Sequence, residues 1–90
     1  MKKFIVERNV PGLGKMSQKE LQAITQKSND VLKGMDTPYH WLESYVTGDK
    51  MYCVHIAENE DAIREHAKRG GFPADKIVEI TGMIDPSTTE

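Results

Sequence analysis

Residues 39–57 read YHWLESYV-TGDK-MYCVHIA, and this stretch decides the fold. Two runs rich in aromatic and β-branched residues flank the polar segment TGDK at 47–50. Such runs on either side of a Gly-Asp turn are typical of a β-hairpin. We therefore predict two antiparallel strands, at 39–46 and 51–57.

A strand and a helix are predicted on each side of this hairpin. Before it, residues 2–10 predict a strand that a Pro-Gly pair ends, and the capping box SQKE at 17–20 begins a long helix. After it, Glu-Asn at 58–59 begins a second helix, and residues 76–83 predict a fourth strand. The predicted order of elements is therefore β-α-β-β-α-β.

This order predicts an α+β domain with the ferredoxin-like arrangement. With right-handed crossovers the strand order is 4-1-3-2, the sheet is antiparallel, and both helices cover one of its faces. Ninety residues suffice for one domain only, which we place at residues 1–85, and residues 86–90 form a polar C-terminal tail.

Composition excludes several classes of function. The net charge of −2 comes from interspersed acids and bases without a basic stripe, so we expect no nucleic-acid partner. No apolar run approaches the length of a membrane span, and the charged N-terminal residues lack the apolar core of a signal peptide. Cys53 is the single cysteine, which suits a reducing compartment. We therefore expect a cytoplasmic protein with no membrane partner.

Alternation along the strands divides their residues between two faces of the sheet. The mostly aliphatic set is expected under the helices: Phe4, Val6, Leu42, Val46, Val54, Ile56, Val78 and Ile80. The other set is expected on the helix-free face: Ile5, Glu7, Trp41, Glu43, Tyr45, Cys53, His55, Ile77, Glu79 and Thr81. A face with such large apolar groups usually marks an interface. We expect a second copy to cover it sheet-to-sheet, as in a dimeric α+β barrel, and to enclose a partly polar space.

The register of the hairpin has an alternative. A two-residue Gly-Asp turn pairs Tyr45 with Tyr52. The side chains that share a face with Cys53 are then His40 and Ser44 rather than Tyr45, because a shift of one residue reverses the faces of a strand. The assignment above requires an odd-length loop or a bulge instead, and both alternatives stay open.

Three side chains are candidate metal ligands. In the assignment above, Glu7 near the end of the first strand lies opposite Cys53 near the start of its neighbour, with His55 one step along the same face. Thiolate, imidazole and carboxylate are ligands for nickel, zinc or copper. His66, on the inner side of the second helix, is expected to be a structural histidine.

The same face also suggests a site for a small organic molecule. Trp41 and Tyr45 could stack on such a ligand, and Glu43, Glu79 or His55 could act as a general base. No Ser/His/Asp signature accompanies them, so no particular reaction is predicted. Ordinary roles as solvated glutamates and interface aromatics are the alternative.

Three blocks of the sequence resemble a bacterial family of small ferredoxin-like proteins of unknown function that are often labelled nickel-binding protein. They are FIVERNVPG at 4–12, WLESYVTGDKMYCVHIA at 41–57 and AIREHAKRGGFPADKI at 62–77. The resemblance implies a homodimer and nickel binding by at least one member, and it implies no established reaction. Matching positions include Glu7, Ser44, Tyr45, Cys53 and His66. The chain departs from the family at His55, where we expect tyrosine, and at Ile56, where we expect glutamate.

Taken together, these observations predict a small cytoplasmic homodimer that binds a divalent transition metal, nickel or alternatively zinc. The second hypothesis is the binding or conversion of a small organic molecule in the dimer cavity, as in isomerases or monooxygenases built as dimeric α+β barrels.

Overall fold

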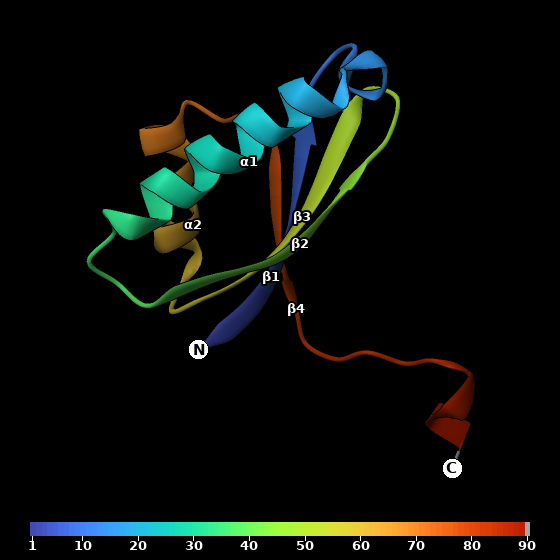
Figure 1. The fold of residues 1–90 in the computed structure, drawn as a ribbon. Helices are drawn as coiled ribbons and strands as arrows, with labels where there is room; N and C mark the ends of the chain where they lie inside the picture. Colours follow the sequence, from blue (N-terminus) through green and yellow to red (C-terminus); the bar gives the residue numbers. More distant parts are fainter. Residues whose placement is uncertain (90) are drawn as a thin grey trace.

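The structure is a computed structural model that describes residues 1–89. Four strands and two helices follow one another in the predicted order (Figure 1). The elements are β1 (Lys2–Asn9), α1 (Gln18–Lys33), β2 (Tyr39–Val46), β3 (Lys50–Ala57), α2 (Glu60–Gly70) and β4 (Lys76–Ile80), with short 3₁₀ turns at Leu13–Lys15 and Pro86–Thr89.

The sheet has the strand order β2-β3-β1-β4, and all three neighbouring pairs are antiparallel. Both helices lie on the same side of this sheet (Figure 1). The arrangement is the ferredoxin-like α+β fold that the hairpin and its two flanking strand–helix units predict.

Local signals explain where the helices begin and end. The Ser17 hydroxyl accepts a hydrogen bond from the Glu20 backbone N–H, and the Glu20 carboxylate accepts one from the Ser17 N–H, which completes a capping box before α1. Asn59 caps α2 through a 2.9 Å bond from the Ala62 N–H. Gly71 ends α2 with φ of 68°, a left-handed conformation that glycine adopts without strain.

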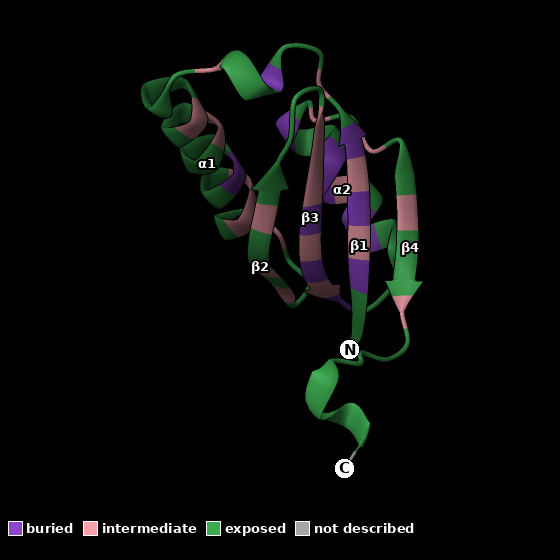
Figure 2. Cartoon of the chain, turned by 90° about the vertical axis from the view of Figure 1, so that its right-hand side faces the viewer, coloured by how far each residue is buried: buried purple, intermediate pink, exposed green. Residues whose placement is uncertain are grey.

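The fourth strand is shorter than predicted. Pairing with β1 ends at Ile80, whereas the sequence suggested a strand as far as Met83. The segment from 81 to 89 is exposed throughout and extends away from the sheet in both views (Figures 1 and 2). Continuing this register would place Thr81 opposite Lys2 and Gly82 opposite Met1, so β1 has no residue to pair with Met83.

The core lies between the two central strands and α2. Figure 2 shows the buried positions concentrated on β1, β3 and α2, while α1 and β2 are mostly exposed. One apolar cluster joins the strands to α2: Phe4, Val6, Cys53, Ala57, Ala62 and Ile63. The helix α1 buries only Ser28, so it covers the sheet less tightly than α2 does.

The predicted faces of β3 and β4 are reversed in the structure. Cys53 pairs with Val6 and His55 pairs with Phe4, so both side chains lie under the helices, 4% and 1% exposed. Ile77 likewise packs against the core. The residues of these strands on the helix-free face are instead the aliphatic ones: Val54, Ile56, Val78 and Ile80. The prediction failed because it assumed that the more aliphatic face must lie under the helices.

The register of the hairpin combines both alternatives. Tyr45 pairs with Tyr52, as the two-residue turn requires. A bulge between Trp41 and Glu43 then shifts the strand by one residue. Ser44 therefore shares a face with Cys53, as the second alternative expected, although this face is the helix-covered one. His40 does not, because beyond the bulge it pairs with Ile56 on the helix-free face and Trp41 takes the position opposite His55.

Candidate functional site

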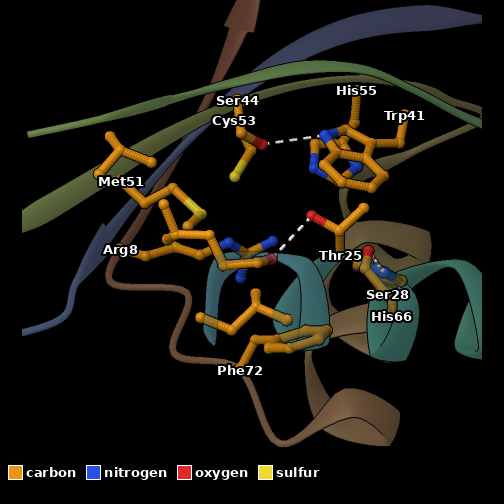
Figure 3. A pocket seen from close by; sticks show the side chains of 13 residues that line it. Arg8, Thr25, Ser28, Trp41, Ser44, Met51, Cys53, His55, His66 and Phe72 are labelled. Atoms are coloured by element: carbon orange, nitrogen blue, oxygen red, sulfur yellow. Dashed lines mark hydrogen bonds between the residues drawn. The ribbon is translucent and has the colours of Figure 1, made fainter. Parts of the chain in front are cut away.

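A cavity of about 160 Å³ lies under α1, against the half of the sheet formed by β2 and β3 (Figure 3). Leu21 and Ile24 of α1 line one side, and Trp41 and Met51 of the hairpin line the other. The apolar residues that α1 turns toward this part of the sheet, Leu21 and Ile24, are only half-buried. The cavity is the best candidate for a functional site, because concave apolar pockets with a few polar groups are where small ligands bind.

Two buried histidines form one end of this cavity. His55 of β3 and His66 of α2 are each 1% exposed, and their ring centroids are 5.5 Å apart. His66 Nε2 is hydrogen-bonded to the buried Ser28 hydroxyl at 3.2 Å, which fits the expected structural role. Within residues 1–89, neither ring nitrogen of His55 has a hydrogen-bond partner, and His66 Nδ1 has none.

The environment keeps both imidazoles neutral. Burial, followed by the proximity of His66 and then of Arg8, lowers the pKa of His55 to about 3. Burial and then Arg8 lower the pKa of His66 to about 4, with the Ser28 bond opposing the shift. Neutral imidazole is the form that donates a lone pair to a metal ion or accepts a proton.

Arg8 is the functional candidate that the sequence analysis missed. It lies on the central strand β1, is 4% exposed, and lines the cavity. Its Nη1 donates a hydrogen bond to the Pro73 carbonyl, and its guanidinium lies 5.7 Å from the Phe72 ring centroid. The signal was present, because Arg8 has the same parity as Phe4 and Val6, which the sequence placed under the helices.

The three predicted metal ligands do not meet. Cys53 and His55 both line the cavity under α1. Glu7 pairs with Tyr52 on the helix-free face, where its carboxylate accepts a 3.2 Å hydrogen bond from Lys50 Nζ. Across residues 1–89, no three His, Cys, Asp or Glu side chains are grouped closely enough to hold a metal ion.

The residues predicted to hold an organic molecule are also divided between the faces. Trp41 lines the cavity under α1, where its indole N–H donates a 2.9 Å hydrogen bond to the Ser44 hydroxyl. Glu43 and Tyr45 pair with Val54 and Tyr52 on the helix-free face, and Tyr45 is 54% exposed. These three side chains therefore cannot form one binding site within a single chain.

Residues 4–80 match the family model described as nickel responsive protein SCO4226-like. The chain belongs to this family. The match runs from Phe4 in β1 to the end of β4 and leaves out only residues 1–3 and the exposed C-terminal segment. It confirms the family resemblance that the three sequence blocks indicate.

A solved structure shares the fold of this SCO4226-like chain. The crystal structure of SCO4226 from Streptomyces coelicolor A3(2) superposes with a TM-score of 0.77 at 20% sequence identity. The alignment covers 91% of this chain and 99% of SCO4226. At this identity the likeness establishes the ferredoxin-like fold. A comparison with curated proteins finds no significant match. None of the helices in the described part of the chain has the length and apolar character needed to cross a bilayer.

Proposed function

We propose that this protein binds a divalent transition metal, nickel above all, through Cys53 and His55. Membership of a nickel-responsive family supports the choice of metal. The observation that carries the proposal is the state of His55, because both of its ring nitrogens are buried without a hydrogen-bond partner in the structure that residues 1–89 form. The neutral imidazole, which has no hydrogen-bond partner among the described residues, and the free thiol of Cys53 provide two lone-pair donors for a metal ion.

The chemistry of the donors fits nickel or zinc. A thiolate and an imidazole are ligands that both metals accept, and they project from the same face of β3 two residues apart. The described residues add no third ligand of the usual kinds at this point. The proposal therefore assigns two ligands to this chain and leaves the remaining coordination positions to water. Glu7 is not among them, because it projects from the opposite face of the sheet.

Calorimetric titration of Ni²⁺ into reduced, tag-free protein tests the proposal. Cys53→Ser removes the thiolate with little change of volume, so nickel affinity should fall at least tenfold. Glu7→Gln is the matched control, because it alters a candidate ligand on the other face and should leave the affinity unchanged. Equal nickel affinity of wild type and Cys53→Ser would contradict the proposal. Loss of nickel binding in Glu7→Gln would instead place the nickel site on the helix-free face.

We also propose that the protein is a homodimer that buries the helix-free face of the sheet. This face carries a continuous set of apolar side chains: Ile5, Tyr45, Tyr52, Val54, Ile56, Val78 and Ile80. Val78 is 44% exposed and Tyr45 54% exposed in the single chain. Apolar patches of this kind on a small domain usually mark an interface, and a second copy would also enlarge the small core.

A further inference from the structure

The cavity under α1 contains a buried cation without a counter-ion. Arg8 is the only lysine, arginine, aspartate or glutamate among the residues that line the cavity. None of the salt bridges formed within residues 1–89 includes Arg8. Of its five side-chain N–H groups, one on Nη1 donates a hydrogen bond to the Pro73 carbonyl, and within residues 1–89 the other four have no hydrogen-bond partner. Nε and Nη2 are not among the fully buried, unpartnered polar atoms of the described residues, and Arg8 lines the cavity.

An unpaired buried charge is costly, and proteins normally match it with an opposite charge. Figure 3 shows the Arg8 side chain extending into the cavity between Cys53 and Met51 on the sheet side and Phe72 on the other. The guanidinium fork is suited to bidentate pairing with a planar anion such as a carboxylate. The position of Arg8 therefore defines where the anionic group of a ligand belongs.

The remaining walls define the body of the ligand. They are mainly apolar and aromatic: Leu21, Ile24, Trp41, Val46, Met51 and Phe72. The volume of about 160 Å³ is close to that of an engineered protein cavity of about 150 Å³ that binds benzene. We propose that this cavity binds a single-ring aromatic carboxylate, with its ring against these walls and its carboxylate on Arg8. The site lies within one chain and goes beyond the metal-binding proposal.

A charge series of ligands on wild-type protein tests this assignment. The probes are 4-fluorobenzoate, 4-fluorobenzyl alcohol and 4-fluorobenzylamine, followed by ¹⁹F NMR with EDTA present to exclude any metal. 4-Fluorobenzoate should bind at least tenfold more tightly than 4-fluorobenzyl alcohol, and 4-fluorobenzylamine should have the lowest affinity of the three. Trp41 is the only tryptophan of the chain and lines the cavity, so benzoate should also change its fluorescence. Equal affinity for the three probes, or no benzoate binding at millimolar concentration, would overturn the proposal.

Two variants test whether Arg8 is the residue that binds the carboxylate. Arg8→Met keeps the length of the side chain without its charge, and it should lower benzoate affinity at least tenfold while leaving the weak binding of the alcohol. Lys50→Met is the matched control, because it removes a cation that pairs with Glu7 on the opposite face of the sheet, and benzoate affinity should not change. Unchanged benzoate binding by folded Arg8→Met would refute the role of Arg8. If Arg8→Met does not fold, the charge series on wild type decides alone. Failure of nickel binding would leave all these results unaffected.

Discussion

The imidazole of His55 packs edge-on against the Tyr39 ring, with centroids 5.1 Å apart, and His66 stacks at a tilt against the same ring at 5.1 Å. The Tyr39 hydroxyl is also buried without a partner among the described residues, and burial raises its pKa. Three polar rings thus share a buried space with little hydrogen bonding. Such groups are stable only in their neutral forms, because charging any of them there costs desolvation energy.

Metal-free protein should lose stability as the pH falls below about 6.5. In the unfolded chain both buried histidines take up protons near the usual pKa of about 6.5. In the folded chain the pKa values are about 4 for His66 and about 3 for His55, so the unfolded state binds more protons in this interval. For each histidine, stability falls by about 1.4 kcal/mol for every pH unit that separates its folded and unfolded pKa values. Urea titrations in EDTA should show a loss on the order of a few kcal/mol by pH 4.

Two variants test whether this loss of stability comes from the buried histidines. His66→Gln removes one titrating group, so the slope of stability against pH should decrease whatever its effect at neutral pH. Gln22→Ala removes no titrating group from an exposed position of α1 and should leave the slope unchanged. A wild-type stability that stays flat from pH 6.5 to 4.5 would contradict the lowered pKa values of the two buried histidines.

At the scale of the elements, the capping box of α1 supplements packing that is only partial. The helix covers the cavity, yet Ser28 is its only buried residue. Ser17→Ala removes one of the two reciprocal bonds, which typically costs about 1 kcal/mol. For a domain of this size the thermal midpoint should fall by about 4–8 °C. Gln18→Ala, one residue further along, makes no such bond and should change the midpoint little. A midpoint that Ser17→Ala does not lower would mean that α1 is held by its packing alone.

The elements and their order could be predicted from sequence because their signals are local. A serine and a glutamate three residues apart, a Gly-Asp turn and a glycine at a helix end each act within a few residues. The sides of β3 could not be predicted, since Val54 and Ile56 make one face as apolar as the other. No glycine marks the position of the bulge between Trp41 and Glu43 in the sequence. This one irregularity decides that Trp41, and not His40, reaches the cavity.

The candidate site could likewise be predicted only in part. Cys53 and His55 were identified from their residue types, and the structure keeps them together in the cavity. Glu7 was assigned to them through the reversed face of β3, and the register separates it from both. Arg8 was overlooked because a charge under the helices conflicts with the expectation of an apolar core. Arg8 is a candidate ligand-binding residue because the described residues give it no counter-ion. Only their three-dimensional arrangement shows this.

For the whole molecule, the unusual feature is that the helix-free face is the more aliphatic one. Arg8, Ser28, His55 and His66 are buried on the helix side, whereas Val54, Ile56 and Val78 lie on the open side. A domain of 90 residues buries only roughly 60–65% of its unfolded surface, so it gains much from covering such a face. A second copy applied through a two-fold axis would present the same face to it.

Ile5→Lys tests this arrangement at its centre, because Ile5 lies between Val54 of β3 and Val78 of β4. In a separated chain the new ammonium group reaches water from an open sheet, so the domain should still fold. In a dimer the same charge is buried without a partner, which typically costs several kcal/mol. Light scattering at micromolar concentration should therefore give the mass of a dimer for wild type and of a monomer for Ile5→Lys. Gln22→Lys adds an equal charge at an exposed position of α1 and should remain dimeric. A wild-type monomer, or an Ile5→Lys variant as dimeric as Gln22→Lys, would contradict sheet-to-sheet association.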